Sequence, residues 1–96
     1  MLITLILDFS ENYTFTDFDE DKNFSLYKTF ENDLIPRVND YVYDTGFRKD
    51  LMVMKVVWDY EHNKCNVYLN RSNIGNFEEV KIQAMDAGWK ATQGHI

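Results

Sequence analysis

The chain has 96 residues, enough for one small domain, and its 45% apolar and 16% aromatic content excludes the composition of a disordered chain. Its net charge of −6 opposes direct binding to nucleic acid, because phosphates repel an acidic surface. The single cysteine, Cys65, excludes an internal disulfide and fits a reducing compartment, and no Cys/His cluster has zinc-site spacing. We therefore expect no cofactor.

The negative charge is concentrated in the first third of the chain. Residues 8–33 hold eight acids and two bases, which gives −6, whereas residues 34–96 hold eight of each. Such an asymmetry favours a basic protein or nucleoprotein partner through long-range attraction.

The first predicted element is a strand over residues 2–9, a nearly continuous apolar run that is typical of a central strand. The run is too short to cross a bilayer, and it lacks the basic start and small-residue cleavage site of a signal peptide. We expect a cytoplasmic protein that does not enter a membrane.

An acidic and aromatic segment follows, with an exposed loop predicted at residues 17–23. Spaced carboxylates can imitate phosphates, and neighbouring rings can anchor a protein interface. The alternative is a solubilising loop whose phenylalanines pack into the core. A calcium loop of the EF-hand type is excluded, because Lys22 and Lys28 replace its glycine and glutamate. The predicted partner-binding residues form an acidic face: Tyr13, Asp17, Phe18, Asp19, Glu20 and Asp21.

Four more strands are predicted from alternating or β-branched runs, at residues 24–30, 41–43, 51–60 and 65–69. The polar turn at residues 61–64 makes the last two a β-hairpin. Asn39, before the second of these strands, suits a turn residue with positive φ.

One helix is predicted over residues 77–87, from apolar residues at helical spacing. Asn76 and Glu79 have the spacing of a capping box, and Gly88 is a left-handed stop. Trp89 can fold back on the last turn. The tail, residues 90–96, is predicted to fray or to add a short strand.

The hairpin rings Trp58, Tyr60 and Tyr68 raise the question of a base-stacking platform. Too few arginines and lysines surround them in an acidic chain, so core packing and cross-strand pairing are the favoured interpretation. No catalytic motif is present, and His62 is expected in an exposed turn. We do not expect an enzyme, and we predict no catalytic or metal-binding residues.

Residues 34–70 resemble small SH3-like barrel proteins of phages and bacterial mobile elements. The resemblance rests on Ile35-Pro36-Arg37-Val38-Asn39-Asp40-Tyr41-Val42, on the run from Met54 to Tyr60, and on Val67-Tyr68-Leu69. In this family a Pro-Arg-Val-Gly-Asp turn often precedes a strand and a long hairpin, and Asn39 stands where glycine is usual. The resemblance implies a phage or prophage origin and a bacterial host cytoplasm. It supplies no catalytic residues.

These patterns predict one α+β domain over residues 1–96: a five-stranded antiparallel, SH3-like sheet or partial barrel with one C-terminal helix. The favoured function is a non-enzymatic inhibitor, similar in composition to anti-CRISPR proteins, that binds a host CRISPR or restriction complex through the acidic face. The alternative is an assembly domain that self-associates through a sheet edge or apolar patch. A small enzyme or ligand-binding barrel ranks third.

Overall fold

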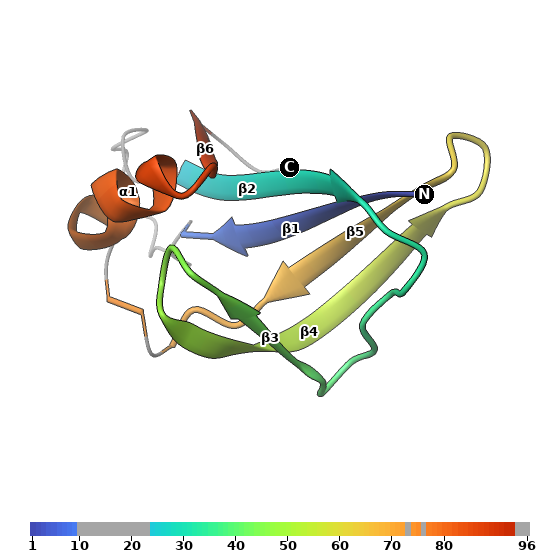
Figure 1. Ribbon diagram of the computed structural model, residues 1–96, viewed down its shortest axis with the longest axis horizontal. Helices are drawn as coiled ribbons and strands as arrows, with labels where there is room; N and C mark the ends of the chain where they lie inside the picture. Colours follow the sequence, from blue (N-terminus) through green and yellow to red (C-terminus); the bar gives the residue numbers. More distant parts are fainter. Residues whose placement is uncertain (10–23, 73, 76, 94–96) are drawn as a thin grey trace, which may run out of the picture.

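A computed structural model describes residues 1–9, 24–72, 74–75 and 77–93 (Figure 1). The described part holds six strands and one helix. The sixth strand lies in the tail, which the sequence predicts either to fray or to add a short strand. The elements are β1 (Leu2–Asp8), β2 (Phe24–Glu31), β3 (Tyr41–Asp44), β4 (Lys49–Asp59), β5 (Lys64–Leu69), α1 (Phe77–Asp86) and β6 (Lys90–Gln93).

The strands form one sheet in the order β3-β4-β5-β1-β2-β6, so β1 is central as its apolar run predicts. β1 pairs antiparallel with β2 but parallel with β5. The prediction of a five-stranded, wholly antiparallel sheet is therefore wrong: the sheet has six strands and is mixed. Apolar patterning determines which side chains are buried, but it carries no information about the direction of a neighbouring strand that is distant in the sequence.

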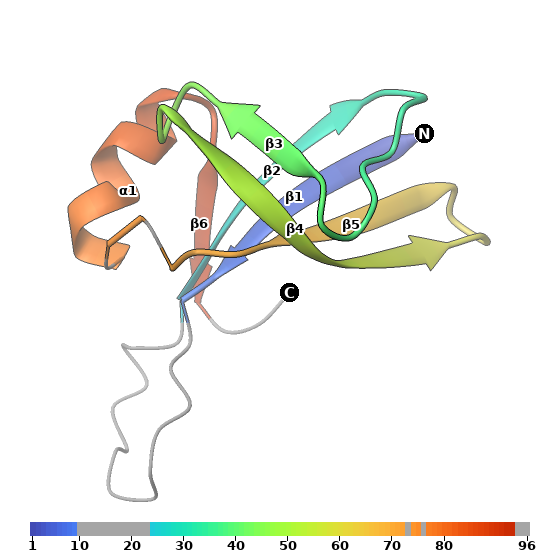
Figure 2. The same cartoon turned by 90° about the horizontal axis from the view of Figure 1, so that it is seen from below.

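The sheet curls around a core that lies on one face, here called the inner face (Figure 2). Alternate residues of the two central strands point inward and are buried. These are Ile3, Leu5 and Leu7 of β1 and Cys65, Val67 and Leu69 of β5. The opposite face, here the outer face, carries Thr4, Ile6, Asn66 and Tyr68.

A β-bulge at Met54 changes which residues of β4 face inward. Val53 pairs with Leu69, but Lys55 pairs with Tyr68, so Met54 is an extra residue in the ladder. Beyond the bulge, Val56 pairs with Val67 and therefore faces inward. Trp58, which pairs with Cys65, faces inward as well, and Lys55 lies on the outer face beside Tyr68. An unbroken alternation from Val53 would have reversed these orientations.

The helix closes one end of the inner face. Phe77 stacks on Phe24 with ring centroids 4.6 Å apart and meets Phe9 edge-on at 5.6 Å. The helix ends at the glycine that the sequence predicts: Gly88 has φ of 94°. Its N–H donates to the Met85 carbonyl, and the Trp89 N–H donates to the Ala84 carbonyl. This pair of bonds is a Schellman motif. The predicted capping residue Asn76 lies outside the described residues.

The connection from β2 to β3 crosses the inner face at the end away from the helix (Figure 2). Ile35 packs against the core, and Asn39 adopts φ of 77°. The Asn39 N–H donates to the Val53 carbonyl at 2.8 Å, and the Asp40 carboxylate accepts from the Arg37 N–H at 2.8 Å. The expectation that Asn39 takes a left-handed conformation is confirmed.

Candidate functional site

The predicted acidic face lies outside the described residues. All six of its members fall within residues 10–23: Tyr13, Asp17, Phe18, Asp19, Glu20 and Asp21. The candidate site of the described part consists of other residues.

A group of large apolar side chains is exposed at the end of the sheet opposite the helix. Trp58 is 47% exposed and Tyr60 is 87% exposed, and their rings are stacked with centroids 6.4 Å apart. Val38, 50% exposed, lines a shallow groove together with Trp58, Ile35 and half-buried Val56. We call Val38, Trp58 and Tyr60 the aromatic patch.

Two local features produce the aromatic patch. The Met54 bulge turns Trp58 to the inner face, at a row of the sheet that the helix does not reach. Pro36 and the turn at residues 37–40 bring Val38 to the same groove. Large rings left this exposed in a small chain are typical of interaction surfaces.

The surroundings of the aromatic patch are acidic. Glu31 of β2 and Asp59 of β4 fall in one row at this end of the sheet, because they pair with Leu2 and with Lys64, which pair with each other. This row points to the outer face, so these two acids add charge at the same end of the sheet without contacting the patch. The segments that border the patch carry five acids and two bases: Glu31, Asp33, Asp40, Asp59 and Glu61, and Arg37 and Lys64. A basic surface would complement this rim.

The hairpin rings do not form one platform. Trp58 and Tyr60 lie on the side of the inner face, whereas Tyr68 lies on the outer face beside Ile6 and Lys55. This arrangement opposes base stacking along the hairpin. Core packing is the wrong interpretation for Trp58 and Tyr60, because both are exposed, whereas the expected cross-strand pairing holds for Trp58, which is opposite Cys65.

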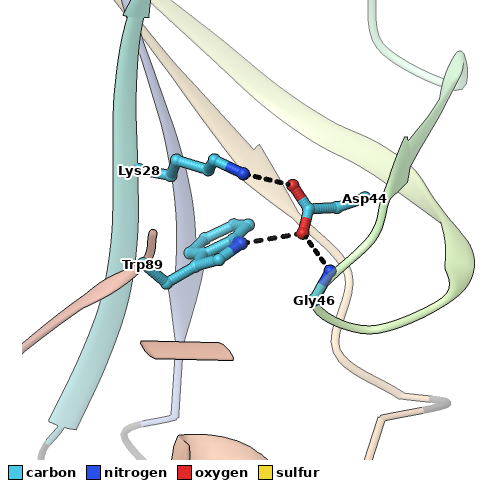
Figure 3. A network of polar contacts seen from close by, with 4 residues as sticks. All are labelled: Lys28, Asp44, Gly46 and Trp89. Atoms are coloured by element: carbon cyan, nitrogen blue, oxygen red, sulfur yellow. Dashed lines mark hydrogen bonds and ion pairs between the residues drawn. The ribbon is translucent and has the colours of Figure 1, made fainter. Parts of the chain in front are cut away.

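A buried carboxylate, Asp44, sits at the end of β3 (Figure 3). Its Oδ1 accepts from the Gly46 N–H at 2.8 Å and from the Trp89 indole Nε1–H at 2.9 Å, and its Oδ2 accepts from Lys28 Nζ at 3.2 Å. Burial by itself would raise the pKa of Asp44, but the bonds from Trp89, Gly46 and Lys28 outweigh it and lower that pKa. A carboxylate engaged in this way has a structural role.

The turn between β4 and β5 holds an exposed pair. His62 Nδ1 lies 2.9 Å from Asp59 Oδ2, and the bond from His62 lowers the pKa of Asp59. His62 is in a turn, as predicted. Within the described ranges no group of three or more His, Cys, Asp or Glu side chains could hold a metal ion. No helix in this part of the chain is long and apolar enough to cross a membrane.

Comparisons with protein-family models, with curated proteins and with solved structures gave no match for this chain. The candidate site therefore rests on its own geometry.

Sequence reasoning did not locate the aromatic patch, although a readable pattern was present. Inward residues of β4 are Leu51 and Val53 and then Val56 and Trp58, a shift of one position that indicates a bulge. Exposed apolar neighbours, such as Val57, obscured the shift.

Proposed function

We propose that this protein is a small non-enzymatic binding domain that docks on a basic protein partner through the aromatic patch. The observation that carries the proposal is the stacked pair of Trp58 and Tyr60, exposed at the rim of an apolar groove. Tryptophan and tyrosine dominate the binding energy of protein interfaces, because a large ring buries much apolar surface at little entropic cost.

The acids in the segments that border the aromatic patch favour a partner with a basic surface. Two copies of this chain meeting at the aromatic patch would bring like charges together, at a cost in binding free energy. A partner with apolar residues bordered by lysine and arginine has the opposite charge pattern. The acids of residues 8–33 add long-range attraction for the same partner.

Basic partners of this kind include nucleoprotein complexes. Such a complex uses cationic clefts to hold nucleic acid, so a tightly bound acidic domain would compete for them. One such function is inhibition of a bacterial host CRISPR or restriction complex. In that case Asp17, Asp19, Glu20 and Asp21 would also contact the partner. The alternative function is self-assembly through the apolar surface. The test must distinguish it from binding to a basic partner.

The test compares the native chain with a Trp58→Ala/Tyr60→Ala double variant. A partner captured from bacterial lysate is purified and titrated against each protein by calorimetry at low and high salt. We expect the double variant to bind at least about a hundredfold more weakly, since each anchor contributes about 2 kcal/mol or more. We also expect the affinity of the native chain to fall with salt.

The matched control is Ile82→Ser, which removes an apolar side chain that is 73% exposed on the helix, away from the aromatic patch. It should bind like the native chain. Equal binding by the double variant would refute the proposal. Sedimentation of the native chain as a concentration-dependent dimer, lost in the double variant, would favour self-assembly instead.

A further inference from the structure

A second concave surface lies on the outer face of the sheet, where the Met54 bulge interrupts β4. This outer-face pocket has a volume of about 590 Å³, within the range of small-molecule sites. Its apolar surface comes from exposed Met54 and half-buried Tyr68, with buried Ile6 beneath them, and its charged lining is Lys55, Arg71 and Asp8.

The bulge is what brings the first cation to the outer-face pocket. Lys55, Tyr68 and Ile6 form one cross-strand row because the extra residue, Met54, shifts the register of β4. Lys55 Nζ lies 4.5 Å from the centroid of the Tyr68 ring, so the ammonium is held over an aromatic face. β-bulges often redirect a side chain in this way next to a binding site.

The second cation comes from the chain just beyond β5. The Arg71 guanidinium lies 5.3 Å from the centroid of the buried Phe9 ring. Within the described residues, neither Arg71 nor Lys55 forms an ion pair with a carboxylate. Asp8, the one acid in the lining, has an interaction of its own. The lining therefore has a net charge of +1 in a chain whose overall charge is −6.

We propose that the outer-face pocket binds a small organic anion that carries an apolar body. Lys55 and Arg71 would bind the anionic group, and Met54 and Tyr68 would contact the apolar part. Two cations that pair with no carboxylate among the described residues, beside an apolar surface, complement such a molecule in both charge and polarity. This proposal does not use the aromatic patch, which lies elsewhere on the sheet.

The probe for this test is 2-naphthoate, compared with the neutral 2-naphthamide of the same ring system. Each is titrated into the full chain while backbone amide shifts are followed by NMR. We expect naphthoate to shift the amides of residues 54–55 and 68–72 and to bind about tenfold more tightly than the amide, because only the anion gains attraction from two nearby cations.

Lys55→Gln and Arg71→Gln should each weaken naphthoate binding about fivefold while the chain stays folded, since both changes are at the surface. Lys90→Gln, an exposed lysine on β6, is the matched control and should bind like the native chain. Three results would overturn the proposal: no shifts at about 5 mM naphthoate, equal affinity for the two probes, or binding that neither Lys55→Gln nor Arg71→Gln weakens.

Discussion

The indole nitrogen of Trp89 donates a hydrogen bond to the carboxylate of Asp44 across 45 residues of sequence, with Nε1 and Oδ1 2.9 Å apart. The bond joins the residue just beyond the helix to the end of β3, and the Trp89 ring also packs edge-on against Phe47 at 5.1 Å. With Lys28 of β2 on its other oxygen, Asp44 ties together three separate parts of the fold (Figure 3).

Removing this carboxylate should be costly. Asp44→Ala leaves the Trp89 indole and the Gly46 amide without their acceptor and Lys28 without its counter-ion, so we expect a loss of about 3 kcal/mol in the free energy of unfolding. Urea unfolding followed by circular dichroism measures it. Asp50→Ala, which removes an exposed acid of β4, is the control and should change stability by less than about 0.5 kcal/mol.

The same carboxylate should make stability depend on pH. The pKa of Asp44 in the folded chain is lower than in the unfolded chain, where it is about 3.9. Its contribution is therefore complete above that pH and declines as the pH falls through the lowered pKa. The stability difference between the native chain and Asp44→Asn should be constant near neutral pH and shrink below about pH 4. A difference that stayed constant down to about pH 2 would contradict the assignment.

Gly88 should resist replacement because of its backbone. Its φ of 94° is in a region that side chains disfavour, while the space where a Cβ would stand is open, with Lys28 Cε at 3.7 Å. We expect Gly88→Ala to destabilise the fold by about 1 kcal/mol and Gly88→Asn by less, since asparagine tolerates positive φ. Thermal unfolding checks this order. An equal effect of both substitutions would point to crowding instead.

The Cys65 thiol should be unreactive in the folded chain. It is fully buried in β5, and burial raises its pKa, which leaves little thiolate to react. We expect labelling by Ellman's reagent to be slower than for an unfolded peptide thiol by about a thousandfold or more, with full reactivity in denaturant. Rapid labelling of the native chain would mean that the core around β5 opens easily.

Much of the fold was predictable because it depends on local patterns. The apolar run of β1, the alternation of β5 and the glycine after the helix each predict the element that the structure contains. The parallel pairing of β1 with β5 was not predictable, since it joins segments about sixty residues apart and no turn chemistry connects them. The hydrogen bond between Trp89 and Asp44 was not predictable for the same reason, since the two residues are 45 positions apart.

The aromatic patch escaped sequence reasoning because exposure is a property of the whole fold. Trp58 has the strand position of a core residue, and it does face inward, yet α1, the helix of the described part, lies at the other end of the sheet. The acidic face that the sequence predicts lies at residues 13–21, outside the described residues, so it stays a prediction.

One inserted residue determines both proposed surfaces. The Met54 bulge sends Trp58 to the inner side, where it joins Val38, and sends Lys55 to the outer side, where it lies over Tyr68. A regular strand would have exchanged these positions and abolished both sites.

The most direct test of this account is a NOESY spectrum of the native chain, which reports which side chains lie within about 5 Å of each other. We predict contacts from the Trp58 ring to the Val38 methyl groups, and from the Lys55 side chain to the Tyr68 ring. Contacts from the Trp58 ring to Lys64 and Leu2 on the outer face would contradict the bulge, and with it both proposed sites.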